Sequence, residues 1–212
     1  MTKKEMACRA VDTLSRQYPD AVCSLEAVDP FQLLVATRLS AQCTDARVNL
    51  VTPALFAAYP TPSAMAKATY EEVESYIRSC GLYKTKAKSL VELSKAICER
   101  FNGRVPGTME ELLTLPGIGR KTANLILGDI FHVPSSVVTD THLIRIAYRI
   151  GLTDAKEPYK VEVQLRKILP PEGASDFCHR VVHFGRDICT ARSPRCGECP
   201  MNDFCKKRNY KK

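Results

Sequence analysis

The stretch LPGIGRKTA, Leu115–Ala123, decides the fold of this chain. A proline and two glycines interrupt a helical pattern, and Arg120 and Lys121 follow at once. Upstream, the residues TMEE, Thr108–Glu111, fit a capping box with Thr108 as N-cap. The pattern predicts a short helix over 109–114, a hairpin over 116–119 and a second helix over 120–129.

The hairpin is also a candidate anion site. Gly117 and Gly119 can adopt positive φ and let a foreign backbone approach closely. The free N–H groups of the hairpin and of the following helix N-terminus suit a phosphate. The alternative is a simple corner between two helices with a solvated Lys121, because glycine turns are common.

The rest of the chain is helical in pattern. Asp29-Pro30 reads as an N-cap followed by proline at the first helical position, and Thr69–Glu72 repeats the capping-box signature. Strand-type alternation is negligible, so the predicted fold class is all-α. The expected helices start near 30 and 70 and cover 45–59, 84–101, 141–150, 158–169 and 175–188. The best candidate for a linker is 132–136.

Charge is distributed unevenly along the 212 residues. The formal net charge is +8, and residues 186–212 hold eight Lys or Arg against three acids, which is +5 of that total. Such an asymmetry indicates a polyanionic partner, either nucleic acid or an acidic membrane surface. Because no apolar run has transmembrane length and no signal-peptide core follows Met1, we expect a cytoplasmic, nucleoid-associated protein.

Four of the ten cysteines are clustered. Cys189, Cys196, Cys199 and Cys205 follow the spacing C-x6-C-x2-C-x5-C, whereas the other six are scattered and are expected to behave as small hydrophobic residues. Short loops that bring four thiolates together are what a metal centre needs. Structural zinc and a [4Fe–4S] cluster are the two candidates, and ligand softness alone does not separate them.

The hairpin and the cysteine loop together resemble the endonuclease III branch of the helix-hairpin-helix DNA glycosylases. LSAQCTD, Leu39–Asp45, and GLYKTKA, Gly81–Ala87, resemble two further segments of that family, and the four motifs lie in its order. The resemblance extends from about residue 21 to 205. It implies a [4Fe–4S] cluster rather than zinc. It also implies two helical domains: residues 22–134 with six helices including the hairpin, and residues 1–21 plus 135–212 with the cluster.

The resemblance further implies a catalytic pair. Lys121 lies where the family places its catalytic amine, and Asp140, nineteen residues later, lies where it places its essential carboxylate. Alone, Asp140 reads as the N-cap of the next helix, and both roles are compatible. A carboxylate stabilises the positive charge that builds on the sugar, and an unprotonated amine attacks it. Partial desolvation and cationic neighbours such as Arg120 favour loss of the amine's proton.

Six residues are predicted to contact DNA. By resemblance, Gln42 fills the space left by a flipped nucleotide and Leu82 acts as a wedge. Without the resemblance, Gln42 reads as an exposed helix-end residue and Leu82 as a hydrophobic contact beyond Gly81. A histidine in the place of His142 is more often a local hydrogen-bonding residue than a catalyst. The predicted set is Gln42, Leu82, Gly117, Gly119, Arg120 and His142.

The implied function is base excision repair. We expect a monomeric DNA glycosylase with abasic-site lyase activity, acting on double-stranded DNA that contains damaged pyrimidines or abasic sites. One alternative is an adenine mismatch glycosylase, against which Lys121 argues. The other is a non-catalytic, metal-containing DNA-binding protein, in which Lys121 and Asp140 would be incidental.

Overall fold

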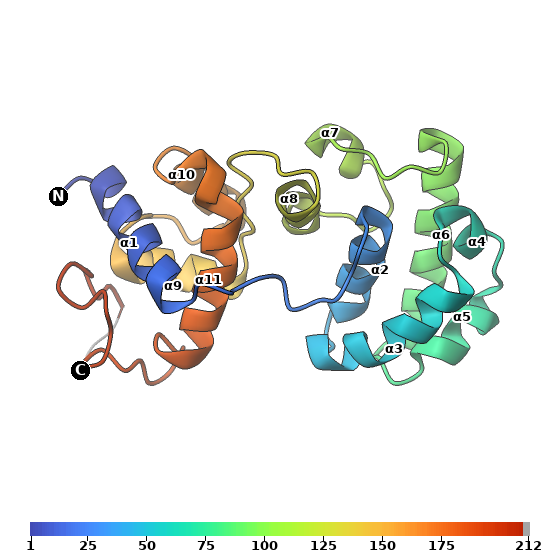
Figure 1. Cartoon of the computed structure of the whole chain (residues 1–212), viewed down its shortest axis with the longest axis horizontal. Coiled ribbons are helices and arrows are strands. Elements are labelled where there is room, and N and C mark those ends of the chain that lie inside the picture. Colours follow the sequence, from blue (N-terminus) through green and yellow to red (C-terminus); the bar gives the residue numbers. More distant parts are fainter. Residues whose placement is uncertain (210–212) are drawn as a thin grey trace. The chain divides into compact units, whose positions relative to one another are not determined.

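The computed structural model describes residues 1–209, and all the regular structure in that range is helical (Figure 1). The all-α prediction is confirmed. The chain forms two compact units, one comprising residues 23–131 and the other residues 1–22 with the described part of 132–212. The predicted domain boundaries were 21/22 and 134/135. Within the described residues, no helix is both long and apolar enough to cross a membrane.

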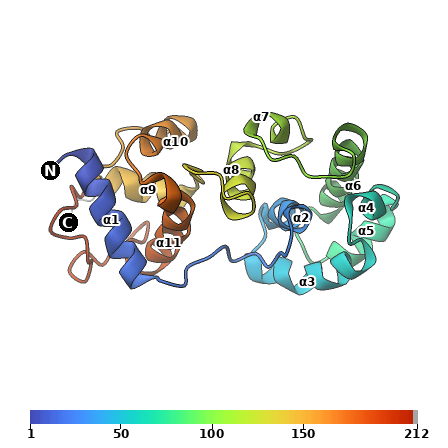
Figure 2. The same cartoon turned by 45° about the horizontal axis from the view of Figure 1, so that its top comes forward.

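The unit of residues 23–131 is built around its longest helix, α6 (Tyr83–Phe101), against which α2, α4 and α5 pack (Figure 2). Its core holds Leu34, Leu39, Ile77, Leu90 and Ile97, all fully buried. The other helices of the unit are α2 (Pro30–Ser40), α3 (Asp45–Ala58), α4 (Pro62–Ala66), α5 (Tyr70–Ile77), α7 (Met109–Leu112) and α8 (Arg120–Asp129).

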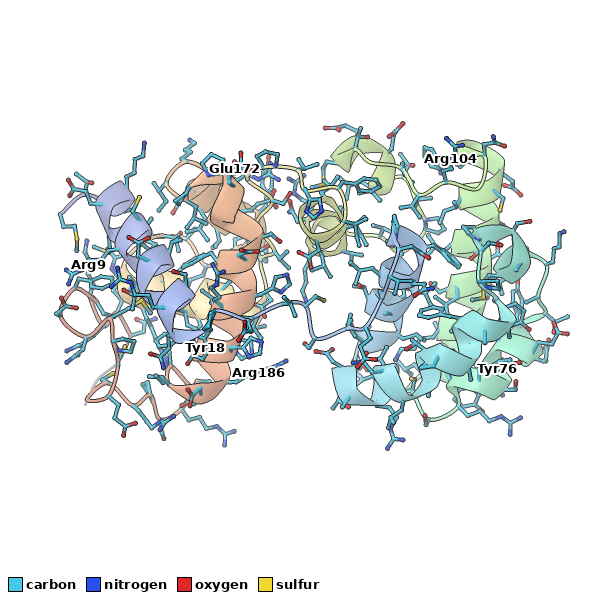
Figure 3. The ribbon with its side chains drawn as sticks, in the orientation of Figure 1. Arg9, Tyr18, Tyr76, Arg104, Glu172 and Arg186 are labelled. Carbon is cyan, nitrogen blue, oxygen red and sulfur yellow. The ribbon has the colours of Figure 1, made fainter. Side chains whose placement is uncertain are left out.

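The second unit packs α11 (Ala174–Asp187) against α1 (Lys3–Gln17) and α9 (Thr141–Ile150), with Phe177 and Phe184 of α11 in its core. It also contains α10 (Pro158–Arg166) and the 3-10 turn η1 (Pro171–Gly173). The cysteine loop follows α11 and is tied to α1, along which Figure 3 labels Arg9 and Tyr18. The Arg9 guanidinium donates to the Asp203 carboxylate of the loop, and the Tyr18 hydroxyl donates to the carboxylate of Asp187, the last residue of α11, at 3.0 Å.

Helix starts agree closely with the sequence prediction because they are set by local capping. Asp29 and Thr69 cap α2 and α5, and Thr69 forms the full capping box with Glu72. Thr108 caps α7, although its hydroxyl, rather than its backbone N–H, donates to the Glu111 carboxylate. Helix α10 ends at Arg166 instead of near 169, and α4 had no clear sequence signal.

Candidate active site and metal centre

The predicted hairpin joins α7 to α8, but its two glycines differ in conformation. Gly117 has φ +74°, as expected for a tight turn. Gly119 has φ −103° and ψ 173°, which is ordinary extended backbone, so the expected positive φ is wrong there. Gly119 is instead the N-cap of α8, no side chain caps that helix, and a Cβ at this position would meet nothing within 4 Å. The N-cap residue of α8 therefore offers no side-chain acceptor to the first N–H groups of the helix.

Arg38 of α2 holds this hairpin in place, and the sequence analysis missed it. Its Nη1 donates to the carbonyl of Gly117 at 2.9 Å, while Nη2 donates to the Ser89 hydroxyl at 2.7 Å. A Cβ on Gly117 would lie 2.8 Å from the Arg38 guanidinium carbon. Nothing in the local pattern predicts a contact between residues 79 positions apart.

Lys121 is the second residue of α8 and its side chain is exposed, rather than partly desolvated as expected. It shares a neighbourhood with Cys23. Burial raises the pKa of the Cys23 thiol to about 11, the charges of Asp129 and Asp45 act in the same direction, and that of Lys121 lowers it. Arg120, the first residue of α8, is half-buried beside it.

Asp140 caps α9, as one of its two predicted roles requires. Its Oδ1 accepts a hydrogen bond from the Leu143 N–H at 2.7 Å, which fixes the half-buried carboxylate at the helix start. His142, two residues on, lies against α11, where a Cβ on Gly185 would come within 2.5 Å of its Nδ1. The Arg145 guanidinium is 3.2 Å from the same ring nitrogen. These contacts fit the local role of His142, and its predicted DNA contact stays a prediction.

Gln42 and Leu82 lie in two loops whose backbones approach each other. Both have left-handed conformations, with φ 56° and 58°, and both are exposed. Leu82 is 61% exposed, so it makes no buried hydrophobic contact beyond Gly81. A Cβ on Gly81 would lie 3.5 Å from the Gln42 carbonyl oxygen.

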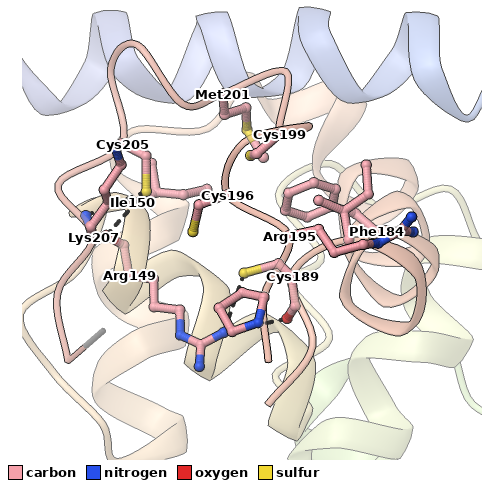
Figure 4. A pocket seen from close by; sticks show the side chains of 12 residues that line it. Arg149, Ile150, Phe184, Cys189, Arg195, Cys196, Cys199, Met201, Cys205 and Lys207 are labelled. Carbon is pink, nitrogen blue, oxygen red and sulfur yellow. Dashed lines mark hydrogen bonds between the residues drawn. The ribbon is translucent and has the colours of Figure 1, made fainter. Parts of the chain in front are cut away.

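The four clustered cysteines line one cavity of about 30 Å³ (Figure 4). Arg149 of α9 reaches its edge, donating to the Thr190 and Ala191 carbonyls at 2.7 and 2.8 Å and lying 3.4 Å from the Cys189 sulfur. At the other end of the loop, the Lys207 N–H donates to the Cys205 sulfur at 3.4 Å. Hydrogen bonds of this kind are what metal-bound thiolates need.

This donor set fits an iron–sulfur cluster. The cavity lining contains four thiols and no His, Asp or Glu. Among the described residues, no three His, Cys, Asp or Glu side chains, the four cysteines included, are arranged so as to hold a single metal ion. Burial raises the pKa of the Cys199 thiol to about 11 and also raises that of Cys205. Coordination to a metal overrides such shifts, because a coordinating thiol is deprotonated.

The basic residues near the cysteine loop are of two kinds. Arg195 donates to the carboxylates of Asp187 and Glu198, so its charge is compensated within the loop. Arg192 and Lys207 are exposed. Lys211 and Lys212, counted in the basic C-terminal segment, lie outside the described residues.

Two family models match the chain. That of the HhH-GPD superfamily base excision DNA repair proteins matches residues 35–171, and that of the iron–sulfur binding domain of endonuclease III matches residues 189–205. The chain is 46% identical to endonuclease III of Synechocystis sp. over 96% of its own length and 93% of that protein. It is 39% identical to endonuclease III of Escherichia coli K12 over 91% and 90% of the two chains.

Solved structures of endonuclease III and of a related glycosylase have the same fold as this chain. A trapped endonuclease III–DNA covalent intermediate superposes with a TM-score of 0.88 at 42% identity, covering 98% of this chain and 97% of the other. A thermostable thymine-DNA glycosylase shares the fold, with a TM-score of 0.86 at 22% identity, 97% of this chain and 96% of the other being covered.

Proposed function

The chain belongs to the endonuclease III family of base excision DNA repair proteins, and from that premise we propose that it excises damaged pyrimidines with Lys121 as nucleophile and Asp140 as the essential carboxylate. It is a DNA-binding glycosylase and abasic-site lyase that carries a [4Fe–4S] cluster. We infer in addition its lesion class, its two catalytic residues and the four cysteines that bind the cluster.

The observation that carries the proposal is the place of Lys121 in the hairpin. Its exposed amine projects from the first turn of α8, next to the uncapped N–H groups at Gly119. A helix N-terminus without a capping side chain favours a phosphate. A DNA strand held by these amides would bring a sugar within reach of Lys121, and covering by DNA would supply the desolvation that the free protein lacks.

The reaction follows from these two side chains. The unprotonated amine of Lys121 attacks C1′ of the damaged nucleotide, the glycosidic C–N bond breaks, and the base leaves with the bond electrons and takes up a proton. The carboxylate of Asp140 stabilises the positive charge that develops on the sugar. The C1′–O4′ bond then breaks, O4′ takes up a proton and the nitrogen loses one, which leaves an imine on the opened sugar. The imine acidifies the C2′ proton, and removal of that proton breaks the C3′–O bond by β-elimination, with the 3′ phosphate as the leaving group.

Four cysteines, Cys189, Cys196, Cys199 and Cys205, would each bind one iron of the cluster. When bound, the cluster joins the ends of an otherwise irregular loop. The exposed side chains of Arg192 and Lys207 on that loop would then meet DNA phosphates. Gln42 and Leu82 would fill the space that the flipped nucleotide leaves. We also propose that the protein is a monomer and is associated with the nucleoid in the cytoplasm.

Borohydride trapping tests the nucleophile. Wild-type protein should be trapped covalently on duplex DNA containing an abasic site or a dihydrothymine, because borohydride reduces the imine to a stable amine. Lys121→Gln should abolish trapping and strand cleavage while DNA binding persists through backbone amides. Lys160→Gln, an exposed lysine on α10, is the matched control and should be trapped as the wild type is.

Two outcomes would contradict the proposal. Undiminished trapping of Lys121→Gln would make another amine, such as Lys84 or the N-terminus, the nucleophile. A panel of single-lesion duplexes tests the substrate class: preferred release of adenine from a mismatch over damaged pyrimidines would favour the alternative glycosylase activity.

A further inference from the structure

The loops that carry Gln42 and Leu82 lie next to each other. The first loop follows α2, and the second immediately precedes α6. Both exposed residues have left-handed backbone conformations, which are unfavourable for side chains other than glycine and persist only where the surroundings hold them. A Cβ on Gly81 would be in van der Waals contact with the Gln42 carbonyl oxygen, at 3.5 Å, so the two backbones lie close together.

Beneath this surface lies Lys86, a buried lysine with no part in the proposed chemistry. Lys86 lies in the first turn of α6 and is only 6% exposed. Its Nζ donates to the carbonyl of Leu39 at 2.8 Å, a bond buried from solvent between residues 47 positions apart. Leu39 belongs to the last turn of α2, whose carbonyls have no partner within the helix and attract a positive charge.

Two thiols adjoin the same place. Cys43 follows Gln42 in the first loop, and buried Cys80 precedes Gly81 in the second. Burial raises the pKa of Cys80 to about 11; a hydrogen bond to Cys43 also raises it, and the charge of Lys86 lowers it. The two loops therefore meet through the two thiols as well as through Gly81, with the ammonium group of Lys86 close by.

A buried lysine is rare, because desolvation of the charge is costly unless a specific interaction offsets it. A methionine at this position would fill similar space without the cost of burying a charge. Packing of the aliphatic part of the side chain therefore does not explain why a lysine is present. What the ammonium adds is one directed bond from the start of α6 to the end of α2. These are the two helix ends from which Leu82 and Gln42 extend.

We propose that Lys86 is a positioning residue that fixes the Gln42 and Leu82 loops relative to each other, so that both side chains enter the duplex as one rigid wedge. The inference rests on the proposed roles of Gln42 and Leu82 in nucleotide flipping. Lys86 touches neither the DNA nor the reacting atoms; it acts through the two loops. Its importance is therefore greatest where the DNA resists flipping.

The test compares two substrates under single-turnover conditions. One is a duplex with dihydrothymine paired to adenine; in the other, the same lesion faces a gap and is already unpaired. Lys86→Met, which keeps the stem but removes the donor, should release base from the paired lesion about 10- to 100-fold more slowly, the range for losing one or two directed contacts in the transition state. On the unpaired lesion the rate should fall by less than about threefold.

Three further variants make the result specific. Lys86→Arg keeps a donor and should restore most of the rate on the paired lesion. Ile97→Val weakens the buried part of α6 at a distance from the loops and should slow both substrates equally, if at all. In a Leu82→Ala background, Lys86→Met should cause little further loss, because residues that act through one unit are not additive. Fluorescence of 2-aminopurine opposite the lesion reports unstacking directly and should fall with the rate.

The roles of Gln42 and Leu82 as a wedge and the positioning role of Lys86 can be disproved separately. If Leu82→Ala and Gln42→Ala do not selectively slow the paired lesion, the wedge assignment is wrong and the role of Lys86 falls with it. If they do and Lys86→Met does not, the wedge stands and the inference about Lys86 is overturned. The inference would also be overturned if Lys86→Met slowed both substrates equally and Ile97→Val, with the same melting temperature, slowed them to the same extent. The loss of rate would then reflect a general effect on folding.

Discussion

At the scale of single residues, Gly117 is constrained twice. Its φ of +74° disfavours any side chain, and a Cβ would lie 2.8 Å from the Arg38 guanidinium carbon. We expect Gly117→Ala to cost about 1–2 kcal/mol for the conformation alone, and more if Arg38 cannot move away. Because the hairpin also binds phosphate in our proposal, affinity for undamaged DNA should fall with stability.

Thermal melting and filter binding measure these two effects. Gly119→Ala is the matched control, since Gly119 has an extended backbone and a Cβ there would meet nothing within 4 Å. It should cost less stability than Gly117→Ala, because only the preference of the N-cap for glycine over alanine is lost, and it should weaken DNA binding. A Gly117→Ala variant with wild-type stability and affinity would show that neither the positive φ nor the Arg38 guanidinium constrains this position.

Asp140 caps α9 and is proposed to be the essential carboxylate, and one substitution can separate these two roles. Asp140→Asn should slow base release by about 10²–10⁴, the usual range for a positioned carboxyl group, because the negative charge is lost. The cap of α9 should survive, since Asn accepts the bond from the Leu143 N–H almost as well. Asp140→Ala should in addition lose about 1 kcal/mol of stability. Near-normal base release by a folded Asn variant would leave Asp140 with its capping role only.

At the scale of elements, α9 organises the cysteine loop. Its Arg149 is 9% exposed and donates to two carbonyls just after Cys189, while the carbonyls of Arg149 and Ile150 accept from the Arg208 and Lys206 N–H groups after Cys205. One helix end thus holds both ends of the loop. The cluster would close a loop that α9 has already shaped.

Arg149→Met should therefore weaken the cluster region. It leaves the two loop carbonyls without their donor, at a cost of about 1–3 kcal/mol. Visible absorbance of the cluster should be lost at lower denaturant concentration, and faster in the presence of an iron chelator. Lys167→Met, an exposed change after α10, serves as control and should match the wild type. Unchanged cluster absorbance in Arg149→Met would mean that the thiolates alone hold the loop.

At the scale of the whole molecule, charge determines how the protein meets DNA. The net charge of +8 predicts affinity that falls steeply with salt, because phosphate contacts release counterions. Lys207→Ala should weaken binding to lesion and undamaged DNA alike and reduce the salt slope by about one. Arg195→Ala is a poor test of direct contact, since Arg195 already pairs with Asp187 and Glu198. Lys160→Ala, which changes an exposed lysine on α10, serves as the control. If Lys207→Ala changed only the preference among lesions, the predicted phosphate contact of Lys207 would be wrong.

The sequence by itself determined the helical class, the hairpin, the start of most helices and the spacing of the four cysteines. These features depend on residues within a few positions of one another: Asp29 and Thr69 cap their own helices, and Gly117 turns its own chain. The proposed catalytic roles of Lys121 and Asp140 came from the resemblance, because no local pattern assigns them. Capping residues and the period of the apolar residues can be read from the sequence without knowing how the helices pack.

Only the tertiary structure decided which side chains hold the functional loops. Arg38 reaches Gly117 across 79 positions, Lys86 reaches Leu39 across 47, and Arg149 reaches Thr190 across 41. Such contacts depend on which helix faces pack together, and many sequence separations are compatible with the same helical pattern. The conformation of Gly119 belongs to the same class: its extended backbone follows from how α8 begins beside the hairpin, whereas the residue type alone permits either sign of φ.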